Sequence, residues 1–385
     1  MKTILIIYAK GSAELLNRKS ALGSYIYCLS ELLEKQGNKV YVNEFELADL
    51  KQMTVPNQST PGVKSRFKKF IPAFIKQYKR DSDIFKGHKN LFESTSMHKG
   101  ITHILEFYTY GSTVGVKLKN LFNVDLVTVF DSPVLEEYEF FYGKKIFNSS
   151  RIIANQNLTL KESSKIVVYS NPVRNYVGKI TQRVNNVFIH QNVDFTRFDF
   201  IDAPRIEHEI KIGFIGSFLK WHRVDLLLTI FEKLAATHLN IRLYLIGDGM
   251  EFTTIETLVQ NSKVKDRIEL TGFCDGEQLL AFKRELHIGV MPGSNWYGAP
   301  NKIFEYGAAG LAVLAPSTPT ITDLFQDKTD LLLFNWDDVD DAYKKLKNLI
   351  EDANLITRLQ VNLQSKIKSK YSSAATIEFY TGMIS

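Results

Sequence analysis

The sequence predicts an α/β fold of two Rossmann-like domains in tandem. Short β-branched runs alternate with segments of helical apolar spacing, a pattern typical of parallel sheets covered by helices on both faces. The alternation lapses in the polar stretch FIDAPRIEHE at 200–209 and then restarts. The length of 385 residues suits two domains of ordinary size.

We place the domain boundary at this interruption of the strand–helix alternation. We expect an N-terminal domain over residues 1–200 and a C-terminal domain over 201–370, with a helix over 371–385 that packs back on the N-terminal domain. In open α/β sheets, ligands bind beyond the carboxyl ends of the strands. Two sheets that face each other would therefore form a ligand-binding cleft between the domains.

About six strands are expected in each half. In the first half they begin at Thr3, Lys39, Ile101, Val124, Lys165 and Asn186. In the second half they begin at Ile210, Ile241, Arg267, Leu286, Leu311 and Asp330. Helical segments lie between them. The first runs from Gly23 to Gly37, with apolar residues at helical spacing and a glycine that ends it.

Composition is that of an ordinary globular protein, with 44% hydrophobic and 23% charged residues. It excludes a collagen-like fibre, a coiled coil and a disordered chain. No window is apolar enough for a membrane span, and the first apolar run is interpreted as a strand and not as a secretory signal. Cys28 and Cys274 fit no disulfide or metal spacing, which indicates a reduced, cytoplasmic protein.

No cluster of His, Cys and carboxylate residues has the spacing of metal ligands, so we expect no metal and no cofactor. The one Asp-x-Asp considered, Asp338 to Asp340, is interpreted as the solvated cap of a helix.

Positive charge gathers in the first half, where 28 Lys and Arg residues stand against 18 Asp and Glu. The excess is concentrated in residues 51–100, and a membrane surface, an anionic acceptor or nucleic acid could each use it. The basic stretch 63–80 combines a helical aromatic face with many lysines. Such a helix can lie on an anionic membrane, at the inner face for a cytoplasmic protein, or it can pack its aromatic face on the sheet. Pro72 favours packing. Nucleic acid is not expected as a partner, because no recognised binding module accompanies the charge.

Three motifs in the second half are candidates for a ligand-binding site. In GFIGSFLKWHR a strand ends before a glycine turn, where backbone amides and the cationic Lys220, His222 and Arg223 can meet an anion. The same segment is equally well explained as an ordinary strand-to-helix turn with solvated charges. The glycines of LIGDG, Gly247 and Gly249, are interpreted as structural.

The most specific motif is PNKIFEYGAAGLAVLAP at 300–316. Pro300 suits a helix entrance, with Asn301 and Lys302 in its first turn and Glu305 one turn on. A carboxylate there can accept two ribose hydroxyls. The alternative for Glu305 is a simple charge near a helix N-terminus.

In their order and spacing these pieces resemble the family 4 (group 1) glycosyltransferases of the GT-B fold. The resemblance covers nearly the whole chain. It rests on the Gly23 helix start, FDSPVLEEYEF and HQNVDFTRF in the first half, and on GSFLKWHRVDLLL, LIGDG, LTGF, MPG and the 300–316 motif in the second.

The resemblance implies a role for each matching residue. Glu305 would hold the donor ribose, and the amides of Asn301 and Lys302 would face the donor phosphates. Gly272 and Phe273 would cradle the base. Gly216 and Ser217 belong to the phosphate turn. Gly23 would approach the diphosphate from the first domain, and Asp131 lies beside the position of a polar residue near the reacting sugar.

The chain also departs from the family. Tyr297 stands where the motif has its first glutamate, which contacts the donor sugar. The family's phosphate-binding Arg and Lys align with Ser217 and His222, so Lys220 or Arg223 would have to supply the charge. The histidine that some members carry aligns near Phe130, and no general base is assigned.

The resemblance implies a retaining, metal-independent hexosyl transfer from a nucleotide sugar, most simply a UDP-sugar, to a hydroxyl of a glycan or lipid-linked acceptor in cell-surface polysaccharide synthesis. A non-catalytic scaffold or activating subunit is the alternative, suggested by Tyr297, Ser217 and Phe130. A nicotinamide-dependent dehydrogenase is disfavoured, because Phe218 interrupts the glycine pattern of KIGFIGSF.

Overall fold

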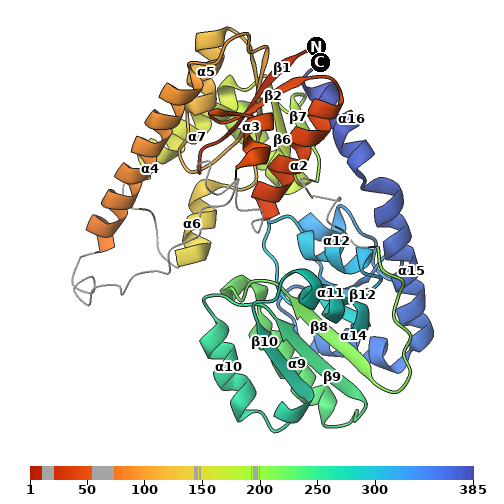
Figure 1. The fold of residues 1–385 in the computed structure, drawn as a ribbon. Coiled ribbons are helices and arrows are strands. Elements are labelled where there is room, and N and C mark those ends of the chain that lie inside the picture. The colour runs from red at the N-terminus through yellow and green to blue at the C-terminus, as the bar shows by residue number, and fades with distance from the viewer. Residues whose placement is uncertain are drawn as a thin grey trace. The chain divides into compact units, whose positions relative to one another are not determined.

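The computed structural model describes residues 1–10, 21–53, 73–142, 146, 149–191, 193, 198 and 200–385. The chain divides into two compact units. Unit 1 comprises Met1–Asp194 with Ser373–Ser385, and unit 2 comprises Phe195–Ser372. Each is described by itself below, with the element labels of Figure 1.

Unit 1 is built on a sheet whose described strands have the order β3-β2-β1-β4-β5-β6-β7. The strands are β1 Thr3–Tyr8, β2 Lys39–Val42, β3 Phe45–Glu46, β4 His103–Phe107, β5 Asp125–Val129, β6 Lys165–Val168 and β7 Val187–Ile189. Neighbours pair in parallel except β2 and β3, which pair antiparallel. The order reverses between β1 and β4.

Helices cover both faces of this sheet. They are α2 Ala21–Lys35, α3 Leu47–Gln52, α4 Ala73–Thr95, α5 Val114–Phe122, α6 Val134–Tyr142, α7 Ser150–Glu162, α8 Asn171–Thr181 and α16 Ser373–Met383. Alternation along β1 decides which face each side chain meets. Ile4 and Ile6 pack with α2 and α16, whereas Leu5 and Ile7 pack with α4 and α5.

Unit 2 has a parallel sheet of order β10-β9-β8-β11-β12-β13, which reverses between β8 and β11. The strands are β8 Ile210–Ile215, β9 Ile241–Ile246, β10 Ile268–Gly272, β11 Ile288–Val290, β12 Ala312–Pro316 and β13 Leu332–Phe334. Between and after them lie η3 Lys220–His222, α9 Val224–Ala235, α10 Phe252–Asn261, η4 Lys265–Arg267, α11 Gly276–Glu285, α12 Asn301–Ala308, α13 Pro319–Thr322, α14 Val339–Glu351 and α15 Ala353–Lys370.

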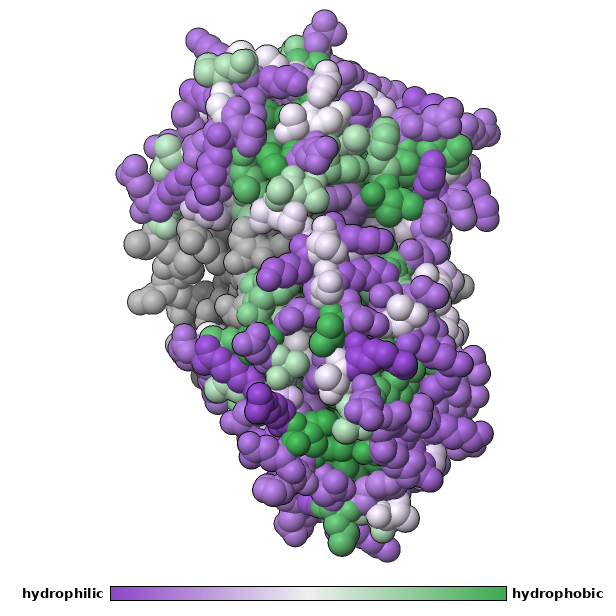
Figure 2. All heavy atoms as spheres, turned by 90° about the vertical axis from the view of Figure 1, so that its right-hand side faces the viewer, coloured by the Kyte–Doolittle hydropathy of each residue, from purple (hydrophilic) through white to green (hydrophobic). Residues whose placement is uncertain are grey.

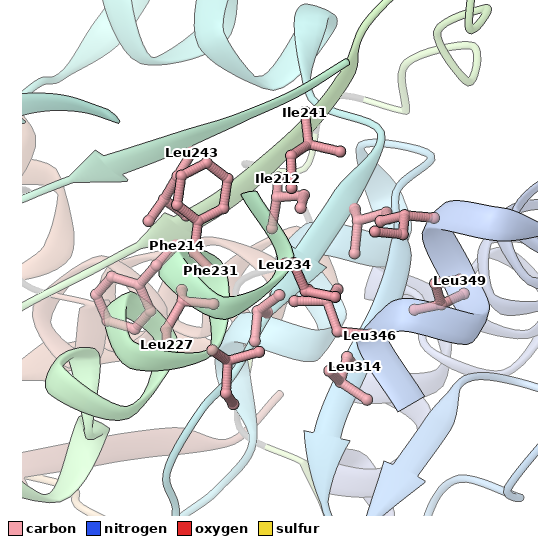
Figure 3. Packing of buried hydrophobic residues seen from close by; sticks show 14 of the residues in the cluster. Ile212, Phe214, Leu227, Phe231, Leu234, Ile241, Leu243, Leu314, Leu346 and Leu349 are labelled. Carbon is pink, nitrogen blue, oxygen red and sulfur yellow. The ribbon is translucent and has the colours of Figure 1, made fainter. Parts of the chain in front are cut away.

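The core of unit 2 lies between one face of this sheet and α9 and α14 (Figure 3). Ile212 and Phe214 of β8 meet Leu227 and Phe231 of α9, and all four are fully buried. Burying such side chains contributes roughly 1.5–3 kcal/mol each. α12 packs on the other face, where the Tyr306 hydroxyl accepts from the Ile215 amide at 2.8 Å. It also packs against α15, since an added Cβ on Gly307 would lie 2.3 Å from Ile367.

The two ends of the described chain meet in unit 1 (Figure 1). Lys2 Nζ donates a hydrogen bond to the Ile384 carbonyl oxygen at 2.6 Å. Tyr380 of α16 is buried in the core that α2 covers, and His190 stacks on Phe379 with ring centroids 4.2 Å apart. The C-terminal helix is thus part of unit 1.

The interpretation of Asp338 as a helix cap is confirmed, because its carboxylate accepts from the amides of Asp340 and Asp341 at the start of α14. Among the described helices, none is long and apolar enough to cross a membrane. On the face shown in Figure 2, hydrophilic residues predominate and hydrophobic ones form small separate patches.

Candidate functional site

The strongest candidate site lies at the carboxyl end of the unit 2 sheet, where the strand order reverses between β8 and β11. Ligands of open α/β sheets bind at such a reversal. The loop after β11 packs directly on η3, since a Cβ on Gly293 would lie 2.1 Å from the Trp221 carbonyl oxygen. The loops after β8 and β11 and the start of α12 therefore meet at one place.

Gly216 ends β8 in a conformation that favours glycine, with φ of +145°. A Cβ there would lie 2.5 Å from Cε of Lys302. Gly247 is equally constrained, because its Cβ would lie 2.0 Å from the Gly216 carbonyl oxygen. The structural interpretation of Gly247 is therefore confirmed, and Gly216 is the residue that makes room for the Lys302 side chain.

Lys302 and His222 form a hydrogen-bonded pair, with Nζ and Nε2 3.0 Å apart. The other ring nitrogen, Nδ1, bonds the Ser217 carbonyl oxygen, so it must carry the ring proton and Nε2 must accept from the ammonium group. Burial, together with the charge of Lys302, lowers the pKa of His222 to about 3. His222 is therefore a neutral partner, and the positive charge belongs to Lys302.

The Lys302 ammonium group is itself perturbed. Burial lowers its pKa to about 8, against the opposing effect of the Glu305 carboxylate. A buried, poorly solvated cation is stabilised by any anion that comes beside it. In the preceding residue, Oδ1 of Asn301 is buried and has no hydrogen-bond partner in the described part of the chain. The Asn301 amide donates to the Ala299 carbonyl oxygen at 2.9 Å.

Glu305 lies one turn further along α12, and its carboxylate is 3.9 Å from the Lys283 ammonium group of α11. The side chain keeps 38% of its surface exposed, so it remains open to a ligand. A long ion pair of this kind contributes little to stability.

Phe273 is an aromatic side chain left 63% exposed at the end of β10. It follows Gly272, whose φ is +75° and whose carbonyl oxygen accepts from the Gly247 amide at 2.8 Å. Tyr297, in contrast, is buried to 5% exposure. Its amide bonds the Asn295 side chain at 3.1 Å within the loop after β11.

Lys220 and Arg223 are not grouped with Lys302. They line a different pocket of about 450 Å³, together with Asp225 and Glu251. The Arg223 guanidinium forms ion pairs with Asp225 and Asp337, so carboxylates already neutralise its charge. Lys302, whose side chain the sequence analysis did not consider, is the cation that lies against Gly216.

Two predicted site residues belong to unit 1. Gly23 is buried in α2. Asp131 follows β5, and the Tyr169 hydroxyl donates to its Oδ1 atom. Burial raises the pKa of Asp131 to about 6, although the Tyr169 hydrogen bond and the nearby Lys10 charge oppose the rise.

The basic stretch 63–80 is described only from residue 73, and its first part lies outside the described residues. In α4, Ile75 and Tyr78 of the supposed packing face are 45% and 78% exposed. These two side chains therefore do not pack on the sheet, which corrects that interpretation for the part of the stretch that the structure describes.

Sequence reasoning assigned the Lys302 amide to the site and missed its side chain. It also missed Tyr169. The available signal for Lys302 was that Ser217 and His222 stand where the family has its phosphate-binding Arg and Lys. The structure also corrects the expectation that His222 is cationic, because its ring is neutral. The described residues contain no group of three or more His, Cys, Asp or Glu placed to hold a metal ion.

Comparison with known proteins gives a consistent answer. Residues 209–352 match the family model described as Glycosyl transferases group 1. The N-acetyl-alpha-D-glucosaminyl L-malate synthase of Bacillus anthracis is 23% identical over 294 residues, which are 74% of this chain and 72% of that protein.

Solved structures share the fold over the full chain. HepE of Anabaena in complex with UDP has a TM-score of 0.71 at 12% identity, with 100% of this chain and 99% of that chain covered. The sucrose-phosphate synthase of Thermosynechococcus elongatus has a TM-score of 0.76 at 16% identity, with 100% and 98% covered. The predicted fold class, two tandem Rossmann-like domains of the GT-B type, is confirmed.

Proposed function

We propose that this chain, whose residues 209–352 match the Glycosyl transferases group 1 family model, transfers a hexosyl group from a nucleoside diphosphate sugar, with UDP as the favoured nucleotide, to a hydroxyl of a glycan or lipid-linked acceptor. The reaction retains the anomeric configuration and serves cell-surface polysaccharide synthesis. The observation that carries the proposal is the Lys302–His222 pair against Gly216 at the strand-order reversal.

The donor site is assembled from unit 2. The Lys302 ammonium group binds the diphosphate, helped by the positive end of the α12 dipole. Glu305 accepts hydrogen bonds from the ribose hydroxyls, and the exposed ring of Phe273 stacks on the base. Tyr297 shapes the wall that the donor sugar meets. His222 orients Lys302 and carries no charge of its own.

In the reaction the bond between the anomeric carbon and the diphosphate oxygen breaks, and a bond from that carbon to the acceptor oxygen forms. Negative charge grows on the leaving diphosphate, and Lys302 stabilises it without a metal ion. The acceptor hydroxyl gives up its proton to the leaving phosphate. Asp131 and Gly23 are the residues of unit 1 for which the family resemblance implies a role in the reaction.

Two known structures support the nucleotide. HepE was solved in complex with UDP and with UDP-glucose, and TarM of S. aureus was solved with UDP and an alpha-GlcNAc-glycerol ligand. We propose a cytoplasmic location, since Cys28 and Cys274 form no disulfide with each other. Contact of the stretch 63–80 with the inner face of a membrane remains a proposal.

Calorimetric titration with nucleoside diphosphates tests the function. Tight binding of one nucleotide supports it, and the absence of binding to any would favour the scaffold role.

A further inference from the structure

A pocket of about 790 Å³ lies in unit 1, at the carboxyl ends of β1 and β4. The strand order of that sheet reverses between these two strands, so the pocket occupies the ligand position of an open α/β sheet. Ala9 and Lys10 follow β1, Thr109 and Tyr110 follow β4, and one face of α4 completes the wall. All of these residues belong to unit 1.

The wall is strongly cationic. Lys76, Lys79 and Arg80 project from one face of α4, at spacings of three and four residues that place side chains together on a helix. With Lys10 they make four cations, against the single carboxylate of Asp83 among the lining residues. His88 adds no charge near neutral pH, because burial lowers its pKa to about 4.

Three of these cations, Lys10, Lys76 and Lys79, are exposed and have no carboxylate partner among the described residues. Some lysines of unit 1 have carboxylate partners, as Lys51 has with Glu34 and Lys119 with Glu162, and others, such as Lys86, have none among the described residues. Within the described part of the chain, no carboxylate comes within ion-pair distance of the lysines that line the pocket.

The pocket also contains an unsatisfied hydroxyl and a well-held guanidinium. Thr109 is 7% exposed, and its Oγ1 atom has no hydrogen-bond partner among the described residues. Buried hydroxyls without partners are rare in proteins, which suggests that a ligand supplies the missing hydrogen bond. Arg80 is fixed by Asp81 at 3.2 Å and by the Tyr138 ring, 4.6 Å from its guanidinium carbon.

Asp131 follows β5, the strand beside β4, so it lies at the same carboxyl edge of the sheet as the pocket. The charge of Lys10 in the pocket wall also opposes the rise in the pKa of Asp131. A phosphate group carries about −1.5 to −2 charges at neutral pH and offers three acceptor oxygens, which suits several lysines, an arginine and a hydroxyl at once.

We propose that the pocket formed by Lys10, Lys76, Lys79, Arg80 and Thr109 binds the phosphate group of a phosphorylated acceptor. The inference rests on the proposed glycosyl transfer and names its acceptor class. The phosphate belongs either to a soluble sugar phosphate or to the head of a lipid-linked acceptor, and both present the same chemistry to the pocket. The hydroxyl that receives the sugar then lies on the part of the acceptor nearest Asp131.

Calorimetry on the full chain tests the inference with two matched pairs of probes: glucose 6-phosphate against glucose, and farnesyl phosphate against farnesol. We expect a phosphate-bearing probe to bind and its unphosphorylated partner not to bind. Binding of glucose 6-phosphate alone identifies a soluble acceptor, and binding of farnesyl phosphate identifies a lipid-linked one. Failure of both phosphates to bind, or binding of L-malate in their place, would overturn the inference.

Two variants place the ligand in the pocket. Lys76→Ala with Lys79→Ala should weaken phosphate binding by about tenfold or more, the loss expected from charge-assisted hydrogen bonds. The matched control is Lys86→Ala with Lys89→Ala, which removes the same charge from exposed positions of α4 outside the pocket wall. An equal loss in both double variants would mean non-specific attraction and would contradict the proposal.

The second variant, Gly87→Leu, leaves every charge in place. A Cβ on Gly87 would meet no atom within 4 Å, so the leucine has room to fold into the pocket that this residue lines. We expect phosphate binding to be lost and UDP binding to be kept. Retained phosphate binding in this variant would contradict the placement of the ligand in the pocket. If the wild type binds no UDP, the proposed function is overturned, and the pocket is judged by the phosphate titrations alone.

Discussion

The ammonium group of Lys302 lies 3.0 Å from Nε2 of His222, although the two residues are 80 positions apart in the sequence. One comes from the start of α12 and the other from η3 after β8. Because the imidazole is neutral and donates through Nδ1 to the Ser217 carbonyl oxygen, it can only accept from Lys302. The pair thus presents one oriented positive charge at the strand-order reversal of unit 2.

Replacing Lys302 should weaken binding of a nucleoside diphosphate. The variant Lys302→Met keeps the length of the side chain and removes the charge, and we expect a loss of about 1.5–3 kcal/mol in UDP binding. Lys263→Met is the matched control, since Lys263 is exposed in unit 2 away from the site. Calorimetric titration of both variants with UDP measures the difference. If they bind UDP with equal affinity, Lys302 is not part of the donor site.

UDP affinity should also fall as the pH rises. The pKa of Lys302 is lowered to about 8, so the ammonium group is mostly charged at pH 7 and loses its proton as the pH passes 8. The anionic diphosphate favours the charged form, and its affinity therefore declines between pH 7 and 9.5. Titrations across this range measure the decline, and Lys302→Met should abolish it. The same decline in the variant would point to another group.

Gly216→Ala should damage both the fold and the site. Its Cβ would lie 2.5 Å from Lys302 Cε, and φ of +145° is strained for any residue with a side chain. We expect a loss of about 1–3 kcal/mol in the free energy of unfolding, together with weaker UDP binding. Gly382→Ala is the control, because its Cβ would meet nothing within 4 Å. Denaturant unfolding that ranks the two variants equally would refute the close packing.

Removing the Tyr169 hydroxyl should shift the pH dependence of transfer. This hydroxyl donates to Asp131 and so stabilises the ionised carboxylate, which already has a pKa raised to about 6. In Tyr169→Phe the pKa rises further, and the acidic limb of kcat moves to higher pH. Tyr176→Phe, which removes a hydrogen bond to Gln156 instead, should leave the limb in place. An unshifted limb in Tyr169→Phe would show that Asp131 need not be ionised.

The sequence predicted the architecture well, because long β-branched runs such as Thr3–Tyr8 and Ile210–Ile215 are unambiguous. It missed β3, whose two residues, Phe45–Glu46, are too few to show a period. In the site, the glycine turns and the start of α12 carried a sequence pattern. The Lys302 side chain did not, because its position depends on the missing Cβ of Gly216 in another loop.

The position of the α4 lysines was also beyond what the sequence pattern could predict. Sequence reasoning saw the lysines of 63–80 as a membrane surface or as the outer face of a packed helix. Where the structure describes α4, Lys76, Lys79 and Arg80 line a pocket, and Tyr78 is exposed. Helical periodicity separates two faces, but it does not say which one meets the strand ends of the sheet.

The central claim is that α12 holds the donor nucleotide, and one measurement tests it most directly. UDP, GDP, ADP, dTDP and CMP are titrated calorimetrically against the wild type and Glu305→Ala. The account predicts a clear preference for one nucleoside diphosphate, with UDP favoured, and a loss of about 1.5–3 kcal/mol in the variant, since the Glu305 carboxylate would no longer hold the ribose hydroxyls. Unchanged affinity in Glu305→Ala, or no binding of any nucleotide to the wild type, would contradict it.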